Sequence, residues 1–149
     1  MPWRHARIRR LHLPARRHWL LLEAAFCLLV ARLALRLVPF RHLTWFFQRS
    51  GACPEVTGAL RRQRIREVRG AILTVTRYLP VRLVCFPRAI AAQTMLRRRG
   101  ITTTLYYGAA RTPEQGLSTH VWVQDGNEGV IGSLAARGYH VLAWYPQRS

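Results

Sequence analysis

The sequence contains no lysine, few acidic residues and few cysteines. All 24 basic residues are arginine, and only 6 residues are Asp or Glu, so the 149-residue chain has a formal net charge of +18. Three cysteines without dense spacing argue against a disulfide-stapled secreted scaffold. The sequence contains no CxxC or CxxH pair that would predict a zinc site, and no P-loop that would predict ATP binding. We therefore expect neither a metal nor a cofactor.

The sequence also lacks an apolar run long enough to cross a bilayer. The clean run at 24–31 is far shorter than the ~20 residues that a spanning helix needs. Glu23 precedes it, Arg32 follows it, and no convincing cleavage site closes it as in a signal peptide. We expect residues 17–38 to form a helix that ends before Pro39. This helix either packs on the rest of the domain, which we favour, or lies on a membrane surface.

Glu23 is predicted to lie on an apolar stripe of this helix. At 100° per residue it shares a face with Cys27, Val30, Ala34 and Leu37. A buried carboxylate needs a cation partner. With 24 arginines in the chain, a structural ion pair is expected in preference to a catalytic role.

The positive charge bears on the kind of partner. A strongly basic surface attracts acidic proteins, phosphate groups and anionic lipid. Patterns typical of nucleic-acid-binding domains are absent, so we predict no specific nucleic-acid partner. A basic binding module for nucleic acid or an anionic membrane is the alternative to an enzyme.

The order of sequence patterns predicts an α+β fold. Residues 1–16 read as a basic, flexible arm, residues 17–80 as a helical region, and residues 81–149 as a catalytic core. The helical region includes a short helix at 40–49 and an apolar pattern over 54–78. The core opens with a helix at 85–99, with Pro87 in its first turn and Gly100 after its end. The β-rich runs that follow are 101–107, 119–124, 129–133 and 140–145.

Cys85 is the strongest candidate for chemistry. It stands at a helix start, where unpaired backbone N–H groups and the helix dipole favour the thiolate. Cys27 lies in the middle of a helix and reads as a core cysteine. Cys53, which precedes Pro54 in a turn, reads as incidental. Cys85 is therefore the predicted nucleophile.

A thiolate nucleophile needs a base that also protonates the leaving group. His120 lies within a predicted strand. Strand alternation places it on the same face as Trp122 and opposite Val121 and Val123. A histidine on a polar and aromatic strand face indicates a functional site and not a position in the hydrophobic core. His140, at the start of the last strand, is a weaker alternative.

Several local motifs resemble those of the lasso-peptide leader peptidases. The run CFPRAIAA at 85–92 resembles their C-L-x-R-S-L-A pattern, and LRRRGI at 96–101 resembles their L-R-R-x-G-I/V junction. The run THVWVQ at 119–124 resembles their A-H-A-W-V-E strand, and VIG at 130–132 resembles the next strand. The resemblance extends upstream into the helical region and covers about residues 17–145.

The resemblance implies a transglutaminase-like cysteine protease in which Cys85 and His120 are catalytic. The Cys helix would pack on an antiparallel sheet. Such proteins remove the leader peptide from a lasso precursor in the bacterial cytoplasm, and a separate lasso cyclase then closes the macrolactam ring. Related systems use a small leader-recognition domain. Residues 1–80 do not read as that domain, so a separate leader-recognition protein is expected.

The sequence departs from the family pattern at the third catalytic position. The family carries an Asp about a dozen residues after the histidine, where this chain has Gly132. Asp125 and Glu128 are nearby candidates for orienting the imidazole, as are Asn127 and a main-chain carbonyl. Asp125 also fits a plain hairpin turn. A Cys–His dyad is possible because the third group mainly orients and stabilises the ring.

Two further residues are candidates for substrate binding. Arg88 matches the family motif, and it either binds precursor carboxylates or pairs with a structural acid. Trp122 shares the predicted face of His120. The backbone N–H of Cys85 is the expected oxyanion donor. An acyl transferase would form the same acyl-enzyme, so transfer to an amine is a third possible function.

Overall fold

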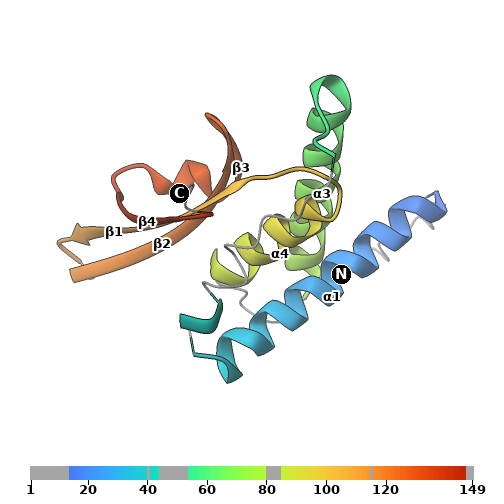
Figure 1. The fold of residues 1–149 in the computed structure, drawn as a ribbon. Helices are drawn as coiled ribbons and strands as arrows, with labels where there is room; N and C mark the ends of the chain where they lie inside the picture. Colours follow the sequence, from blue (N-terminus) through green and yellow to red (C-terminus); the bar gives the residue numbers. More distant parts are fainter. Residues whose placement is uncertain (1–13, 40, 44–53, 80–84, 115, 147–149) are drawn as a thin grey trace, which may run out of the picture.

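The computed structural model describes residues 14–39, 41–43, 54–79, 85–114 and 116–146. Among the described residues, three long helices lie to one side of a four-stranded antiparallel sheet, two of them packed against it and the first packed on those two (Figure 1). The elements are α1 (Ala15–Leu37), α3 (Gly58–Tyr78), α4 (Cys85–Arg97), β1 (Thr104–Thr112), β2 (Gly116–Asp125), β3 (Glu128–Ile131), the 3₁₀ turn η1 (Ser133–Ala136) and β4 (His140–Tyr145). This arrangement confirms the predicted α+β class.

The sheet has the strand order β3-β2-β1-β4. β1 and β2 form the central hairpin, whose register runs from Thr104 opposite Gln124 to Thr112 opposite Gly116. Gly116 begins β2 with a φ of +69°. A residue with a side chain would be strained in this backbone conformation, whereas glycine adopts it readily. Both strands extend further into the hairpin than the sequence pattern predicted.

The helices share one core with the sheet. α1 buries Ala24, Leu28 and Ala31, and α3 buries Val68 and Ile72. Small residues on α1 allow the helix axes to approach closely. Because one cluster joins Ala24, Leu28 and the buried side chains of α3 to α4 and the strands, the core is continuous across the boundary predicted at residue 80.

The valine face of β2 packs against α4. Val121 and Val123 belong to the common core with Leu105 of β1 and the alanines of α4. Trp122 is also buried, but it lies on the other face and outside that cluster. The face that packs on the helices is therefore the aliphatic one, as burial of apolar surface requires.

Parts of the predicted organisation need correction. Most of the arm predicted over 1–16 lies outside the described residues, but its last two residues begin α1. The short helix predicted at 40–49 is described only at residues 41–43, which are helical. α1 ends at Leu37 and Pro39 follows, as predicted.

The face of α1 that points inward also differs from the prediction. Cys27 is buried, but Val30 and Leu37 are 46% and 71% exposed. The buried side is centred on Ala24 and Leu28 instead. Because α1 is apolar on nearly every face, periodicity alone does not identify its buried side. No helix in the described part of the chain is long and apolar enough to cross a membrane.

Glu23 has the cation partners that the sequence predicted. Its carboxylate accepts hydrogen bonds from the Arg99 guanidinium at 3.0 and 2.5 Å, and Arg98 lies 3.5 Å away. The hydrogen bond from Arg99 lowers the pKa of Glu23, against the opposing effect of burial. This ion pair joins the residues that directly follow α4 to α1.

Candidate active site

His120 is held by the main chain of the segment after β3. Its Nε2 atom lies 2.8 Å from the carbonyl oxygen of Gly132. Because a carbonyl can only accept, Nε2 carries the proton in this contact. The neutral ring then leaves Nδ1 as its basic nitrogen, which is the state a general base requires.

Gly132 occupies the position at which the resembled family carries its third catalytic residue. Its φ of +76° lies in the left-handed region. A Cβ there would lie 3.0 Å from the Val121 carbonyl oxygen, 3.2 Å from the Trp122 Cβ and 3.3 Å from His120 Nε2. The glycine thus brings a backbone carbonyl to the imidazole where a side chain would crowd it.

Aromatic rings hold the imidazole from the sides. His120 stacks on Trp122 at a centroid distance of 5.9 Å, and Trp122 stacks on Tyr106 at 5.6 Å. Tyr139 approaches His120 at 5.4 Å, and its hydroxyl lies 2.9 Å from the Ser118 hydroxyl. The ring orientation is therefore fixed on several sides.

Asp125 and Glu128 do not contact His120 in this structure. Asp125 accepts hydrogen bonds from Arg61 Nε at 2.9 Å and Nη2 at 2.6 Å. Arg61 also donates to the carbonyl of Thr102. Glu128 is exposed beside the turn. The orienting contact that these two carboxylates could have made comes instead from the Gly132 carbonyl.

Cys85 begins α4 and packs against the common core. Its neighbour Phe86 contacts the ring of Tyr107 at 6.0 Å, and Tyr107 pairs with Val121 in the sheet. The start of α4 therefore faces the valine side of β2. His120 points to the opposite face, and among the described residues no hydrogen bond joins it to Cys85.

His140, the other histidine in a strand, lies on the opposite face of the sheet from His120. His140 pairs with Ala109 of β1, two residues along from Tyr107. By strand alternation, positions 107 and 109 share the face that α4 covers. His140 is exposed, and it offers the alternative base on the side of the sheet that holds Cys85.

The two predicted substrate-binding residues have different surroundings. Arg88 lies one turn into α4, and its Nε is buried without a hydrogen-bond partner in the described part of the chain. No ion pair to a structural acid is seen for it among those residues. Trp122 is only 4% exposed, so it supports the His120 ring by stacking on it and offers little surface to a ligand.

In the part of the chain that the structure describes, neither Cys27 nor the metal-ligating side chains form a second site. Cys27 is buried in the core, and desolvation raises the pKa of its thiol. Cys53 lies outside the described residues. Within the described ranges no group of three His, Cys, Asp or Glu side chains could hold a metal ion.

Sequence reasoning missed Tyr139, which approaches the His120 ring, and Tyr106, which stacks on Trp122. Alternation along β1 pairs Tyr106 with Trp122 once the register is known, but the sequence does not give the register. Tyr139 reaches His120 through the chain reversal after η1. No periodic signal marks that loop, so only the structure reveals this contact.

The fold agrees with the comparison to known families. The family model described as the transglutaminase-like superfamily matches residues 27–143. The chain therefore belongs to the transglutaminase-like superfamily, whose members are generally cysteine peptidases or acyltransferases. Comparison with curated proteins and with solved structures gave no significant match.

Proposed function

We propose that the protein is a cysteine peptidase that removes the leader from a lasso-peptide precursor before a separate cyclase closes the ring. Membership of the transglutaminase-like superfamily supports thiol chemistry. The finer role rests on the motifs around Cys85 and His120. Within this proposal the protein acts in the bacterial cytoplasm.

The observation that carries the proposal is the contact between His120 and Gly132. The family motif places an orienting group about a dozen residues after the histidine. In this chain that position supplies a carbonyl 2.8 Å from His120 Nε2. The function of the missing Asp, to fix the tautomer and orientation of the imidazole, is thereby available from the backbone.

The chemistry follows from these groups. The Cys85 thiolate attacks the scissile carbonyl, and backbone N–H groups at the start of α4 stabilise the oxyanion. The His120 imidazolium donates its proton to the leaving amine as the C–N bond breaks. Water, deprotonated by His120, then hydrolyses the thioester and releases the peptide acid and free Cys85.

This mechanism requires Cys85 and His120 to meet on one substrate. Cys85 lies on the α4 side of the sheet and His120 projects from the other face of β2, so the start of α4 and the His120 ring have to rearrange relative to each other during catalysis. Substrate binding can stabilise such a shift only if it favours the assembled state. Arg88, with its unpartnered Nε, is the proposed contact for a substrate carboxylate near Cys85.

The proposed partners are the precursor peptide, a separate leader-recognition protein and the lasso cyclase. A thiol-protease site alone reads few residues, so the recognition protein would supply specificity. We expect slow cleavage by this chain alone and faster cleavage with that protein. High salt should slow the association if charge steers it.

The test is cleavage of a precursor, followed by mass spectrometry of the products. Wild-type protein should release leader and core peptides, whereas Cys85→Ala and His120→Ala should release neither. Cys27→Ala is the matched control, because it removes a thiol that lies in the core. Full cleavage by Cys85→Ala would refute the proposal, and transfer of the acyl group to an added amine in place of water would identify an acyltransferase.

A second candidate function is supported by the outer face of α1. Large apolar side chains on this face are 46–72% exposed: Trp19, Leu22, Phe26, Leu29, Val30, Leu33 and Leu37. Arg32 and Arg36 lie beside this stripe on the helix, and α1 runs along the outer edge of the molecule in Figure 1. Such a helix can lie on an anionic membrane.

Vesicle sedimentation tests this second function. Wild-type protein should sediment with phosphatidylglycerol vesicles, and Phe26→Glu should reduce the bound fraction. Leu134→Glu is the control, because Leu134 is equally open at 79% exposure but belongs to η1. Equal binding of both variants, or no binding by the wild type, would exclude α1 as the membrane contact.

A further inference from the structure

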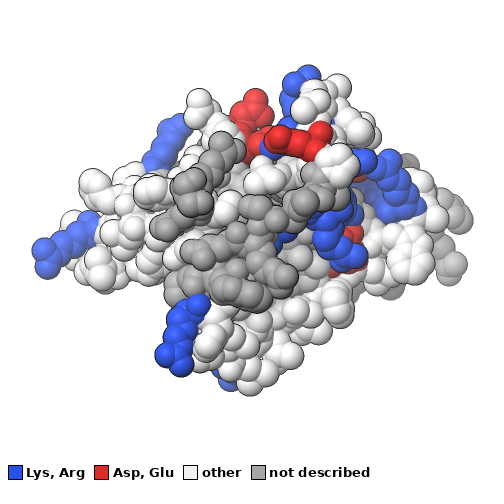
Figure 2. All heavy atoms as spheres, viewed as in Figure 1, with Lys and Arg blue, Asp and Glu red and all other residues white. Residues whose placement is uncertain are grey.

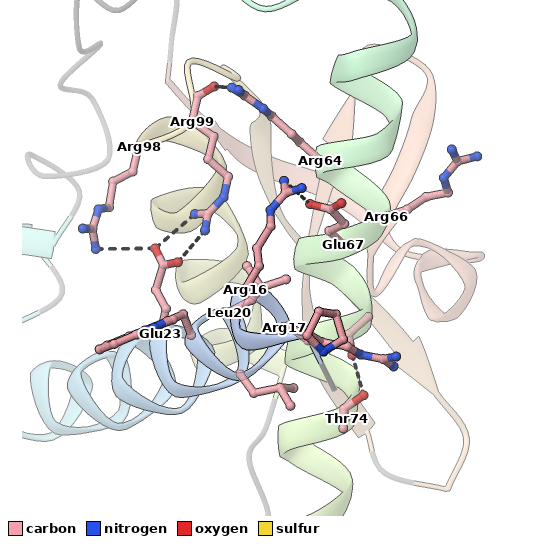
Figure 3. A pocket seen from close by; sticks show the side chains of 15 residues that line it. Arg16, Arg17, Leu20, Glu23, Arg64, Arg66, Glu67, Thr74, Arg98 and Arg99 are labelled. Atoms are coloured by element: carbon pink, nitrogen blue, oxygen red, sulfur yellow. Dashed lines mark hydrogen bonds and ion pairs between the residues drawn. The ribbon is translucent and has the colours of Figure 1, made fainter. Parts of the chain in front are cut away.

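A cleft rich in arginine lies between the first turns of α1, the middle of α3 and the residues after α4 (Figure 3). Its volume of about 820 Å³ falls within the usual range of ligand sites. Its arginines come from all three helical segments: Arg16, Arg17, Arg64, Arg66, Arg98 and Arg99. None of the residues assigned above to catalysis lines it.

The cleft keeps a surplus of positive charge after its internal pairs are formed. Glu23 pairs with Arg98 and Arg99, and Glu67 pairs with Arg16 at 3.1 Å. These two carboxylates are the acidic lining residues, against six arginines. The cleft therefore presents four uncompensated positive charges, which attract a ligand with several negative groups.

Two of the arginines are available to a ligand. Arg17 and Arg66 are exposed, and neither side chain makes a hydrogen bond or ion pair with another residue in the part of the chain that the structure describes. By contrast, Arg64 already donates to the Arg99 carbonyl at 2.8 Å. Arginine binds carboxylates with paired N–H donors, so Arg17 and Arg66 are the expected first contacts.

The walls are not purely basic. Trp19, 72% exposed, and Leu20 and Leu21 line the cleft next to the arginines. This mixture suits a peptide that carries both acidic and apolar side chains. It suits a nucleic acid poorly, because the backbone phosphates would meet the two carboxylates and the apolar wall. On the face shown in Figure 2, the described arginines also form no continuous stripe.

We propose that this Arg cleft binds an acidic segment of the peptide substrate, remote from the bond that is cut. The proposal rests on the peptidase function proposed above. Arg98 and Arg99 directly follow α4, whose first residue is Cys85. A helical rise of ~1.5 Å per residue separates the two places by about 20 Å. An extended peptide at ~3.3 Å per residue spans that distance with about six residues.

Binding is measured on the Cys85→Ala protein, so that cleavage does not enter. The probes are a fluorescein-labelled peptide of alternating Glu and Leu and the same peptide with Gln for Glu, followed by fluorescence anisotropy at low salt. The Glu peptide should bind and the Gln peptide should not. Adding Arg17→Ala and Arg66→Ala should weaken binding at least about fivefold.

The matched control adds Arg62→Ala and Arg69→Ala. These arginines lie on α3, are exposed and do not line the cleft, so this variant loses the same net charge. Equal weakening by the two double variants would overturn the proposal, since it would show attraction to net charge only. Tighter binding of labelled single-stranded DNA, with the same dependence on Arg17 and Arg66, would overturn it in favour of nucleic acid.

The peptidase and the cleft can fail separately. Specific binding of the Glu peptide without any cleavage of a precursor by wild-type protein would refute the peptidase and leave the cleft supported. Cleavage that is unchanged by Arg17→Ala and Arg66→Ala, for a substrate with an acidic segment about six residues from the cut, would refute the cleft and leave the peptidase supported.

Discussion

The Nε2 atom of His120 lies 2.8 Å from the carbonyl oxygen of Gly132. This contact connects the central strand β2 to the residue that follows β3. It gives the imidazole a defined tautomer without any carboxylate. In this chain a backbone carbonyl thus fixes the imidazole tautomer, which a side-chain carboxylate fixes in the resembled family.

Replacing Gly132 by Ala should destabilise the protein and disturb the His120 ring. The left-handed backbone costs about 1–2 kcal/mol for a residue with a Cβ. Crowding against Val121 and Trp122, at 3.0 and 3.2 Å, should add about 1 kcal/mol. Gly138→Ala is the control, because Gly138 has φ +88° and a Cβ there would meet no other atom within 4 Å. Urea unfolding measures both variants, and equal losses would contradict this account of Gly132.

Asp125 is expected to stabilise the fold without taking part in the chemistry. Its two hydrogen bonds with Arg61, at 2.9 and 2.6 Å, join β2 to α3, and they raise the pKa of Arg61. Asp125→Asn should cost about 1–3 kcal/mol of stability and leave precursor cleavage per folded molecule unchanged. A large loss of cleavage at full folding would instead make Asp125 the orienting residue of His120.

Glu23 should make the protein less stable in acid. Its pKa in the folded state lies below the ordinary value of 4.5, chiefly because of the hydrogen bond from Arg99. The stabilising contribution is therefore complete above pH 4.5 and is lost as the pH falls through the folded-state pKa. Glu23→Gln should lose about 1–3 kcal/mol at neutral pH and flatten the pH dependence of unfolding.

Glu67→Gln is the comparison for Glu23. Its partner Arg16 is 75% exposed, so solvent screens this pair and a much smaller loss is expected. Thermal unfolding across acid and neutral pH measures both variants. If the Glu23→Gln protein still lost stability at acid pH as the wild type does, another carboxylate would be responsible for that loss.

Much of the fold follows from local sequence signals. Pro87 in the first turn of α4 and Gly100 beyond its end mark this helix, and the alternation around His120 predicts which residues of β2 share a face. The ion pair of Glu23 was also predictable, because a carboxylate on a mostly apolar helix needs a cation. These features depend on neighbouring residues, so periodicity and composition suffice.

The site depended on contacts that no local pattern contains. The sequence indicated that His120 and the valines take opposite faces, but not that the valine face would pack on α4. Val121 and Val123 match the alanines of that helix in the core, so burial of apolar surface determines the choice. The consequence is that α4 with Cys85 covers one face of β2 while His120 projects from the other, and no hydrogen bond joins the two among the described residues.

The most direct test of the account is the reactivity of the Cys85 thiol. Iodoacetamide labelling at neutral pH, with the labelled cysteine identified by peptide mass spectrometry, reports the thiolate of Cys85 separately from that of buried Cys27. We predict that Cys85 is labelled faster than Cys27 and that precursor peptide protects it. In the free protein His120→Ala should leave the labelling rate unchanged, because His120 meets Cys85 only in the substrate-bound arrangement proposed above, and His140→Ala should leave it unchanged too. Slowing by His140→Ala alone would contradict the pairing of Cys85 with His120 and assign the base to the histidine on the α4 side of the sheet.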